Sequence, residues 1–293
     1  MLGNFLSQRP LASAASSVHV VLTSIPSNEG NECYLEHLSG DDSGIAVLNF
    51  NRPKALNALS HKLVGELRSA LNELRYDQDV RVVIIRSLVE GAFCVGADLK
   101  ERSTMNMTEV KQFLASLRDS FRELETLPIP TIAVIDGAAL GGGLEMALCC
   151  DMRVGGGNKK VKIGLVETKL SIIPGAGGTQ RLPRLIGIPK AKELIFSSKI
   201  LNSASAKEYG ILNHAVTEES GYNKALEVAR EILPMGPLAI RMAKFAIDKG
   251  IQLDIDSGLE CEQACYAQIM HSEDRLEGLA SFREKRKPNY KGH

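Results

Sequence analysis

The 293-residue chain contains no tryptophan, and only 5% of its residues are aromatic. Proteins that bind single-stranded nucleic acids stack bases on aromatic side chains, so this composition offers little material for such a surface. The 35 basic and 35 acidic residues leave no net charge, whereas nucleic-acid-binding domains are usually basic. Both features argue against a dedicated nucleic-acid-binding protein.

Cysteine is also scarce. The chain has six cysteines, with no Cys-x-x-Cys pair and no histidine at the spacing of a zinc site. A disulfide scaffold of this length would need more of them, so we expect reduced thiols. The cysteines are Cys33, Cys94, Cys149, Cys150, Cys261 and Cys265. Cys149 and Cys150 are predicted to lie on a buried helix.

Long apolar runs are missing as well. The most apolar stretch, residues 131–150, is interrupted by Asp136 and Glu145, so no segment is suited to span a membrane. The first 28 residues contain Arg9, several serines and alanines, and no acidic residue. This composition is typical of a mitochondrial transit peptide, and the alternative is an unstructured tail. We therefore predict a leader over residues 1–32.

The remaining sequence alternates short β-rich runs with longer helical periods, which predicts a layered α/β fold. Strands are expected at 44–50, 81–86 and 131–135, and amphipathic helices at 60–76 and 108–127. Asn106 and Glu109 form an N-cap pair for the second helix. Residues 190–293 have an almost wholly helical pattern.

Two β-branched strands run into turns of small residues that are expected to open a helix. These turns are Phe93–Lys100 (FCVGADLK) and Asp136–Glu145 (DGAALGGGLE). Glycine and alanine expose backbone N–H groups, and a helix start leaves such groups unpaired. Two facing turns would form an oxyanion hole. The alternative is that the small residues only permit tight packing.

Two glutamates occur in apolar surroundings. Glu145 follows the triple glycine, and Glu167 lies 22 residues later. An unpaired buried carboxylate is costly, so each should be paired, protonated or catalytic. Two such groups together would suit general acid–base chemistry on a carbon acid or a double bond. Each could instead be a capping or ion-paired side chain.

Five ordered motifs give the chain a specific resemblance. They are Asn51–Ala58 (NRPKALNA), Phe93–Lys100, Asp136–Glu145, Ile173–Leu182 (IPGAGGTQRL) and the tail from Glu277 to Arg286. Over residues 34–293 the chain resembles the enoyl-CoA hydratase (crotonase) superfamily. Within it, the chain looks most like the mitochondrial methylglutaconyl-CoA hydratases and the enoyl-CoA hydratase domain-containing proteins.

The resemblance implies an α/β fold of the crotonase, ClpP-like type, a spiral of ββα units. Residues 33–235 would form this core, and residues 236–293 a helical region that packs homotrimers, which commonly pair into hexamers. The implied activity is addition of water across the Cα–Cβ double bond of a short or branched 2-enoyl-CoA, in the mitochondrial matrix. No metal and no separate cofactor is implied, because coenzyme A is part of the substrate.

The resemblance also assigns roles to individual residues. The amides of Ala97 and Gly142 would hold the thioester oxygen, and Glu145 and Glu167 would hold one water between them. Substrate-binding positions by motif are Lys54, Ala55, Leu56, Asp98, Leu99, Lys100 and Gly175. A carboxylate at the far end of the acyl group could meet Arg102 or Lys169. The tail 275–293, with a formal charge of +4 from six basic and two acidic residues, would either meet CoA phosphates or be a solvated end.

Alternatives to hydration remain. Relatives that lack one of the two glutamates isomerise or hydrolyse acyl-CoA, but this chain keeps both. A related hydratase binds RNA through a lysine-rich helix; the matching residues 60–81 carry four basic and four acidic residues, which argues against RNA binding. A catalytically silent scaffold is a third reading. Residues 155–160 lengthen the interval before Glu167 and would matter if they displaced it.

Overall fold

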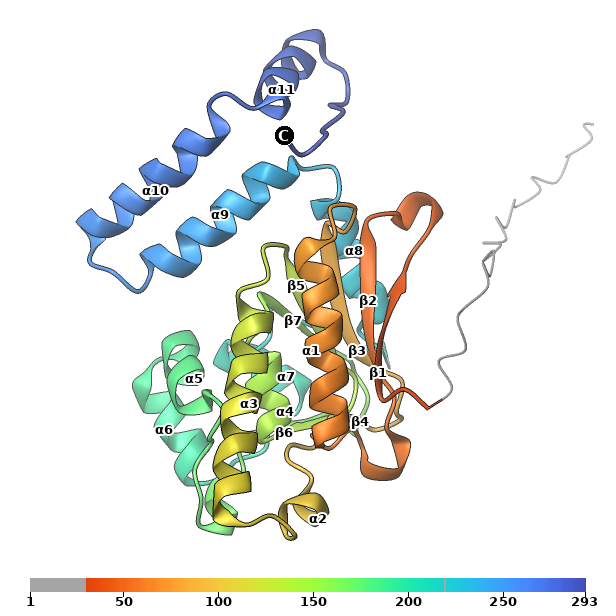
Figure 1. Ribbon diagram of the computed structural model, residues 1–293, viewed down its shortest axis with the longest axis vertical. Coiled ribbons are helices and arrows are strands. Elements are labelled where there is room, and N and C mark those ends of the chain that lie inside the picture. The colour runs from red at the N-terminus through yellow and green to blue at the C-terminus, as the bar shows by residue number, and fades with distance from the viewer. Residues whose placement is uncertain (1–29, 219) are drawn as a thin grey trace, which may run out of the picture. The chain divides into compact units, whose positions relative to one another are not determined.

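The larger of two β-sheets has six strands in the order β1-β2-β3-β5-β7-β9 (Figure 1). Their bounds are Cys33–His37, Ile45–Phe50, Val82–Ser87, Thr131–Ile135, Met152–Gly155 and His214–Ala215. β1 pairs with β2 antiparallel, and the other pairs are parallel. The predicted strands are confirmed within one residue as β2, β3 and β5.

A second sheet contains the short parallel strands β4 (Ala92–Cys94), β6 (Ala138–Leu140) and β8 (Lys162–Gly164). Each follows directly on a strand of the larger sheet, so that β3–β4, β5–β6 and β7–β8 form three pairs along the chain. Helices follow each pair, which confirms the expected repetition of ββα units. Both small-residue turns thus contain a short strand that the sequence did not predict, because three residues show no periodicity.

The two amphipathic helices predicted from leucine and phenylalanine spacing form as α1 (His61–Tyr76) and α3 (Met107–Glu125). The Ser60 side chain accepts the Leu63 N–H and starts α1. Asn106 and Glu109 form a full capping box at α3. The buried faces of both helices contribute to the main core, which the larger sheet also lines.

The computed structural model describes residues 30–218 and 220–293, so residues 1–29 of the predicted leader lie outside the described ranges. Within these ranges no helix is long and apolar enough to cross a membrane. The other helices are α2 (Leu99–Arg102), α4 (Gly142–Ala147), α5 (Gly178–Ile186), α6 (Ile188–Phe196), α7 (Ser203–Tyr209) and α8 (Tyr222–Ile232). The mostly helical prediction for 190–293 is correct except for β9. Cys149 and Cys150 are buried but lie just beyond α4 rather than on it, and all six thiols are free.

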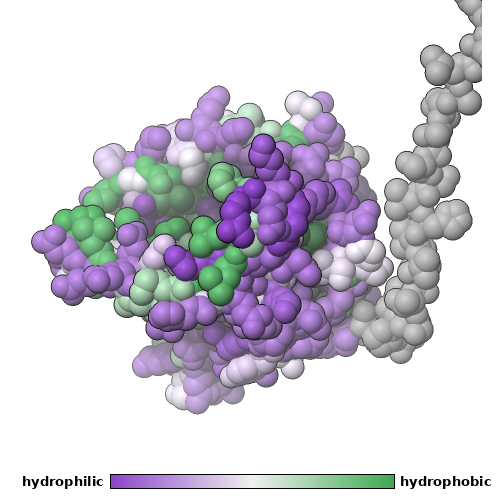
Figure 2. All heavy atoms as spheres, turned by 90° about the horizontal axis from the view of Figure 1, so that it is seen from above, coloured by the Kyte–Doolittle hydropathy of each residue, from purple (hydrophilic) through white to green (hydrophobic). Residues whose placement is uncertain are grey.

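Three helices complete the chain: α9 (Pro237–Gly250), α10 (Ile255–Ile269) and α11 (Glu273–Glu284). α9 and α10 run side by side, joined by a short turn (Figure 1). No residue of α9 is buried, and large apolar side chains on all three helices are exposed. Figure 2, which views the molecule from above, shows apolar patches on that face. Such patches on a soluble fold usually mark an interaction surface.

Candidate active site

The two small-residue turns meet at the ends of β4 and β6. A methyl group built on Gly96 would lie 3.2 Å from the Gly142 amide nitrogen, and one built on Gly142 would lie 3.9 Å from the Ala97 nitrogen. A methyl on Gly143 would come within 2.0 Å of the Cys94 carbonyl oxygen. Glycine is therefore required for the two turns to approach so closely.

The two predicted oxyanion-hole amides are available. The backbone of Leu59 pairs with both neighbours of Ala97. Its N–H donates to the Gly96 carbonyl oxygen, and its carbonyl oxygen accepts from the Asp98 amide. Gly142 is the first residue of α4, where an amide has no partner within the helix. Among the described residues, neither the Ala97 nor the Gly142 N–H donates a hydrogen bond to a backbone or side-chain acceptor.

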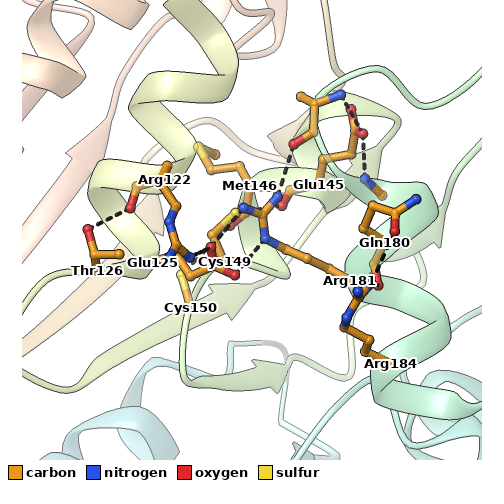
Figure 3. Close-up of polar contacts among 12 residues, drawn as sticks. Arg122, Glu125, Thr126, Glu145, Met146, Cys149, Cys150, Gln180, Arg181 and Arg184 are labelled. Carbon is orange, nitrogen blue, oxygen red and sulfur yellow. Dashed lines mark hydrogen bonds and ion pairs between the residues drawn. The ribbon is translucent and has the colours of Figure 1, made fainter. Parts of the chain in front are cut away.

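Glu145 lies on α4 with only 3% of its surface exposed. Its Oε1 accepts hydrogen bonds of 2.8 Å from the amides of Ala176 and Gly178, at the N-terminus of α5 (Figure 3). Burial raises the pKa of Glu145, and the two amides oppose the rise by favouring the ionised form. The carboxylate is therefore neither ion-paired nor left without donors.

Glu167 opens the 3₁₀ turn Glu167–Leu170, just beyond β8. Its Oε2 is buried and has no hydrogen-bond partner. Burial, with the nearby charge of Glu145 as a further contribution, raises the pKa of Glu167 to about 7. A methyl group on Gly141, at φ 52°, would come within 3.1 Å of Glu167 Oε1. The second carboxyl group thus lies against the glycine turn that leads to Glu145.

Residues 155–160 comprise the last residue of β7 and the start of the loop that follows it. Residues 157, 159 and 160 are exposed, in the loop between β7 and β8. After this loop, β8 pairs with β6 in unbroken register from Lys162 to Gly164. The loop therefore ends before the strand that leads to Glu167.

A cavity of about 1890 Å³ connects these groups. Six of the predicted catalytic, oxyanion-hole and substrate-binding residues line it: Ala97, Leu99, Gly142, Glu145, Glu167 and Gly175. Arg102, suggested for an acyl carboxylate, also lines it. The predicted positions that do not line it are Lys54, Ala55, Leu56, Asp98, Lys100 and Lys169.

The side chain of Asp98 makes local structural contacts. Its carboxylate pairs with Arg52 at 2.7 Å and caps α2 by accepting the amides of Lys100 and Glu101. Leu56 takes a left-handed conformation at the end of a 3₁₀ turn. These motif residues shape the backbone around the Ala97 turn.

A side chain that the sequence did not predict contacts the loop that holds Glu145. Arg181, on α5, donates to both carboxylate oxygens of Glu125 and to the Ala176 carbonyl oxygen at 3.0 Å (Figure 3). The Ala176 amide in turn holds Glu145. Arg181 belongs to the GGTQRL motif, but its partner Glu125 is 56 residues away, so spacing could not identify the pair.

The basic residues of 60–81 are engaged within the protein. Arg68 pairs with Glu123, Arg75 donates to two carbonyl groups, and Arg81 donates to the Met235 carbonyl. In the tail, Arg286 pairs with Glu277 and Glu284. Over the described ranges, no three His, Cys, Asp or Glu side chains are grouped as metal ligands.

Comparison with known proteins agrees with this geometry. The family model for enoyl-CoA hydratase/isomerase matches residues 40–293. The mouse protein named mitochondrial methylglutaconyl-CoA hydratase is 52% identical over 266 residues, covering 89% of this chain and 84% of its own. Mouse enoyl-CoA hydratase domain-containing protein 2, mitochondrial, is 51% identical over 265 residues, covering 89% of each.

A solved structure supports the fold directly. The crystal structure of an enoyl-CoA hydratase from Bacillus anthracis superposes with a TM-score of 0.85 at 43% identity, covering 89% of this chain and all of that one. This confirms the expected crotonase fold. The chain therefore belongs to the enoyl-CoA hydratase/isomerase family, the crotonase superfamily, as an enzyme of the hydratase type.

Proposed function

We propose that this enzyme adds water across the Cα–Cβ double bond of a short or branched 2-enoyl-CoA. The observation that carries the proposal is the convergence of two buried or half-buried carboxyl groups and two unpaired amides on one cavity. Isomerisation needs no bound water, whereas hydration needs one group to take a proton from water and another to give one to carbon. Both groups are present here.

The environments of the two carboxyl groups suggest their roles. Glu145 accepts two amide hydrogen bonds, which favour its ionised form, so we assign it as the base that takes a proton from water. Glu167 has an oxygen without a donor and a pKa of about 7, which favours its protonated form. We assign Glu167 as the acid that delivers a proton to Cα.

The water oxygen bonds to Cβ while Glu145 takes one of its protons, and the double-bond electrons move toward the thioester oxygen. The amides of Ala97 and Gly142 stabilise that developing enolate. When the enolate collapses, Cα takes the proton of Glu167. The result is a 3-hydroxyacyl-CoA, and the two glutamates exchange protons with solvent before the next turnover.

The pH dependence of kcat/KM should report these roles. Protonated Glu167 is lost as the pH rises through about 7, so kcat/KM is expected to fall on the alkaline side. A second fall on the acidic side would follow protonation of Glu145. Rates measured from pH 5 to 9 test this. A rise in activity through pH 7 would show that Glu167 acts in its ionised form and would reverse the assignment.

Arg181 should act as a positioning residue, because it holds the Ala176 carbonyl and the Ala176 amide holds Glu145. Arg181→Met is expected to lower kcat by about 10- to 10²-fold, since small displacements of catalytic groups are costly. Removal of its charge should also raise the pKa of Glu145 and shift the acidic limb upward. Arg184→Met, on the same helix but bonded to Gln180, is the control. An unchanged pH profile in Arg181→Met would contradict the role.

The relatives named as mitochondrial, and the absence of acidic residues from the first 28 positions, support a mitochondrial matrix location. They also support leucine or fatty acid catabolism as the setting, because a hydratase named for methylglutaconyl-CoA is 52% identical. The proposed mechanism uses amides for charge stabilisation, so we expect no metal requirement.

We further propose that α9–α11 pack between copies of this chain in a trimer or hexamer. The exposed apolar side chains of α9 and α10 would otherwise contact water. They include Phe245, Ile247, Ile251, Ile255, Leu259 and Tyr266. Light scattering on the purified protein should give three or six times the chain mass. A monomer at micromolar concentration would contradict this assembly.

The reaction is tested with crotonyl-CoA and 3-methylglutaconyl-CoA side by side in a buffer containing a metal chelator. Loss of the conjugated double bond and appearance of the 3-hydroxyacyl product support the proposal. A folded protein that binds both thioesters but hydrates neither would exclude the proposed reaction on these two substrates.

A further inference from the structure

The wall of the cavity next to Glu145 is formed by α3 and by the loop that precedes α5. Leu114 and Leu117 on the helix, with Ile173 and Pro174 on the loop, make much of this wall apolar. Helix and loop are in contact, since a methyl group on Gly175 would lie 3.6 Å from Leu114 Cδ2. A short acyl chain matches such a wall.

Arg118 interrupts the apolar wall one helical turn after Leu114. Its Nε donates a 2.7 Å hydrogen bond to the Gly175 carbonyl oxygen. Within the part of the chain that the structure describes, its two Nη groups form no ion pair and no hydrogen bond. The guanidinium is therefore held in place by one nitrogen, and the other two remain available to a ligand.

Most other cationic side chains of the cavity are already engaged. Each of them bonds to a carboxylate, a carbonyl oxygen or an amide side chain. These engaged cations are Arg75, Arg122, Arg181, Arg184 and Lys244. Arg102, on α2, also lines the cavity beside Leu99. Arg241 and Lys249, on α9, line the cavity as well. Arg118 differs from these three cations in its hydrogen bond to the loop that holds Glu145.

Arg118 lies close to the groups proposed to react. The Gly175 carbonyl that it binds immediately precedes Ala176, whose amide holds Glu145. Burial raises the pKa of Glu145, and the positive charge of Arg118 is among the effects that oppose the rise. An acyl chain whose reacting carbons lie beside Glu145 would thus bring its far end within reach of this guanidinium.

A guanidinium with two free nitrogens binds a carboxylate or a phosphate in a planar, two-point contact. The anion could therefore come from the acyl group or from CoA. Both CoA phosphate groups are separated from the thioester by the pantetheine arm, whereas Arg118 lies beside the loop at the reacting end. The position favours an acyl carboxylate.

We propose that Arg118 determines specificity by binding a carboxylate at the far end of a short acyl chain. The preferred ligands are CoA thioesters of short dicarboxylic acids. This inference rests on the proposed binding of an acyl-CoA in the cavity, but not on turnover. Arg118 replaces Arg102 and Lys169 as the carboxylate-binding residue.

The test compares the binding of glutaryl-CoA and pentanoyl-CoA, which have five-carbon acyl chains that end in a carboxylate or a methyl group. Calorimetry on the full chain should show at least about tenfold tighter binding of glutaryl-CoA. Arg118→Gln should remove this preference, and Arg118→Lys should give an intermediate ratio. Arg102→Gln, which alters another arginine of the same cavity, should keep it.

Because both ligands carry the same CoA, equal weakening of the two by Arg118→Gln would assign Arg118 to a phosphate and overturn the proposal. So would a wild-type protein without preference, or a preference that survives Arg118→Gln. The ligands are saturated and cannot be hydrated. A failed hydration assay with a retained preference would therefore reject the proposed reaction and leave the role of Arg118 in place.

Discussion

Replacing either Glu145 or Glu167 by glutamine is expected to lower kcat for hydration by about 10²- to 10⁴-fold. Glutamine keeps the volume and one carbonyl oxygen, so the cavity should retain its shape. It can neither take a proton from water nor deliver one to carbon. Steady-state kinetics on both variants measure the loss, and Glu208→Gln, at an exposed position on α7, is the matched control.

A stability measurement separates this effect from misfolding. The folded-state pKa of Glu167 is raised to about 7, above its ordinary value, so the ionised side chain destabilises the fold and stability declines as the pH rises from about 4.5 to 7. Glu167→Gln removes that penalty and should unfold at a higher temperature than the wild type at pH 8. A stable variant with near-wild-type kcat would exclude Glu167 from the chemistry.

Gly142→Pro is expected to lower kcat by about 10²- to 10³-fold, because proline removes one of the two N–H donors of the oxyanion hole. The first position of a helix tolerates proline. Gly141, at φ 52° and ψ −124°, has the mirror image of an extended backbone, which glycine adopts readily before a proline. The fold should therefore accept the change.

Gly142→Ala is the matched control because it keeps the amide. Its new methyl group would lie 3.0 Å from Leu59 Cδ1, the end of a flexible side chain, so only a small adjustment is needed. Kinetics on both variants, with circular dichroism to establish folding, compare loss of the donor with added bulk. An equal loss in the two variants would mean that shape, not the N–H group, matters at Gly142.

The parts of the fold that follow from short-range patterns could be predicted from the sequence. α1 and α3 show regular apolar spacing and explicit caps. The small-residue turns predicted exposed backbone amides, and the family resemblance assigned this role to Ala97 and Gly142. The roles of Glu145 and Glu167 came from the family resemblance, since their apolar surroundings alone left capping or ion pairing open. Their convergence on one cavity required the three-dimensional structure.

Other features depend on contacts between distant segments and could not be predicted. The amides that hold Glu145 lie 31 and 33 residues away, and Arg118 meets Gly175 across 57 residues. In the apolar pattern of α3, Arg118 falls on the polar face of the helix. An arginine at such a position usually indicates only a solvated face. The carboxylate of Asp98 caps α2 and pairs with Arg52, which is 46 residues away.

The most direct measurement of the central claim is the fate of crotonyl-CoA in isotopically labelled water. Incubation of the wild-type enzyme in D₂¹⁸O, followed by mass spectrometry, should yield 3-hydroxybutyryl-CoA with ¹⁸O at Cβ and one deuterium at Cα. Both labels should be lost together in Glu145→Gln/Glu167→Gln. Three outcomes would contradict hydration by the two glutamates. They are deuterium in the recovered crotonyl-CoA, a shifted double bond without ¹⁸O, and release of free CoA.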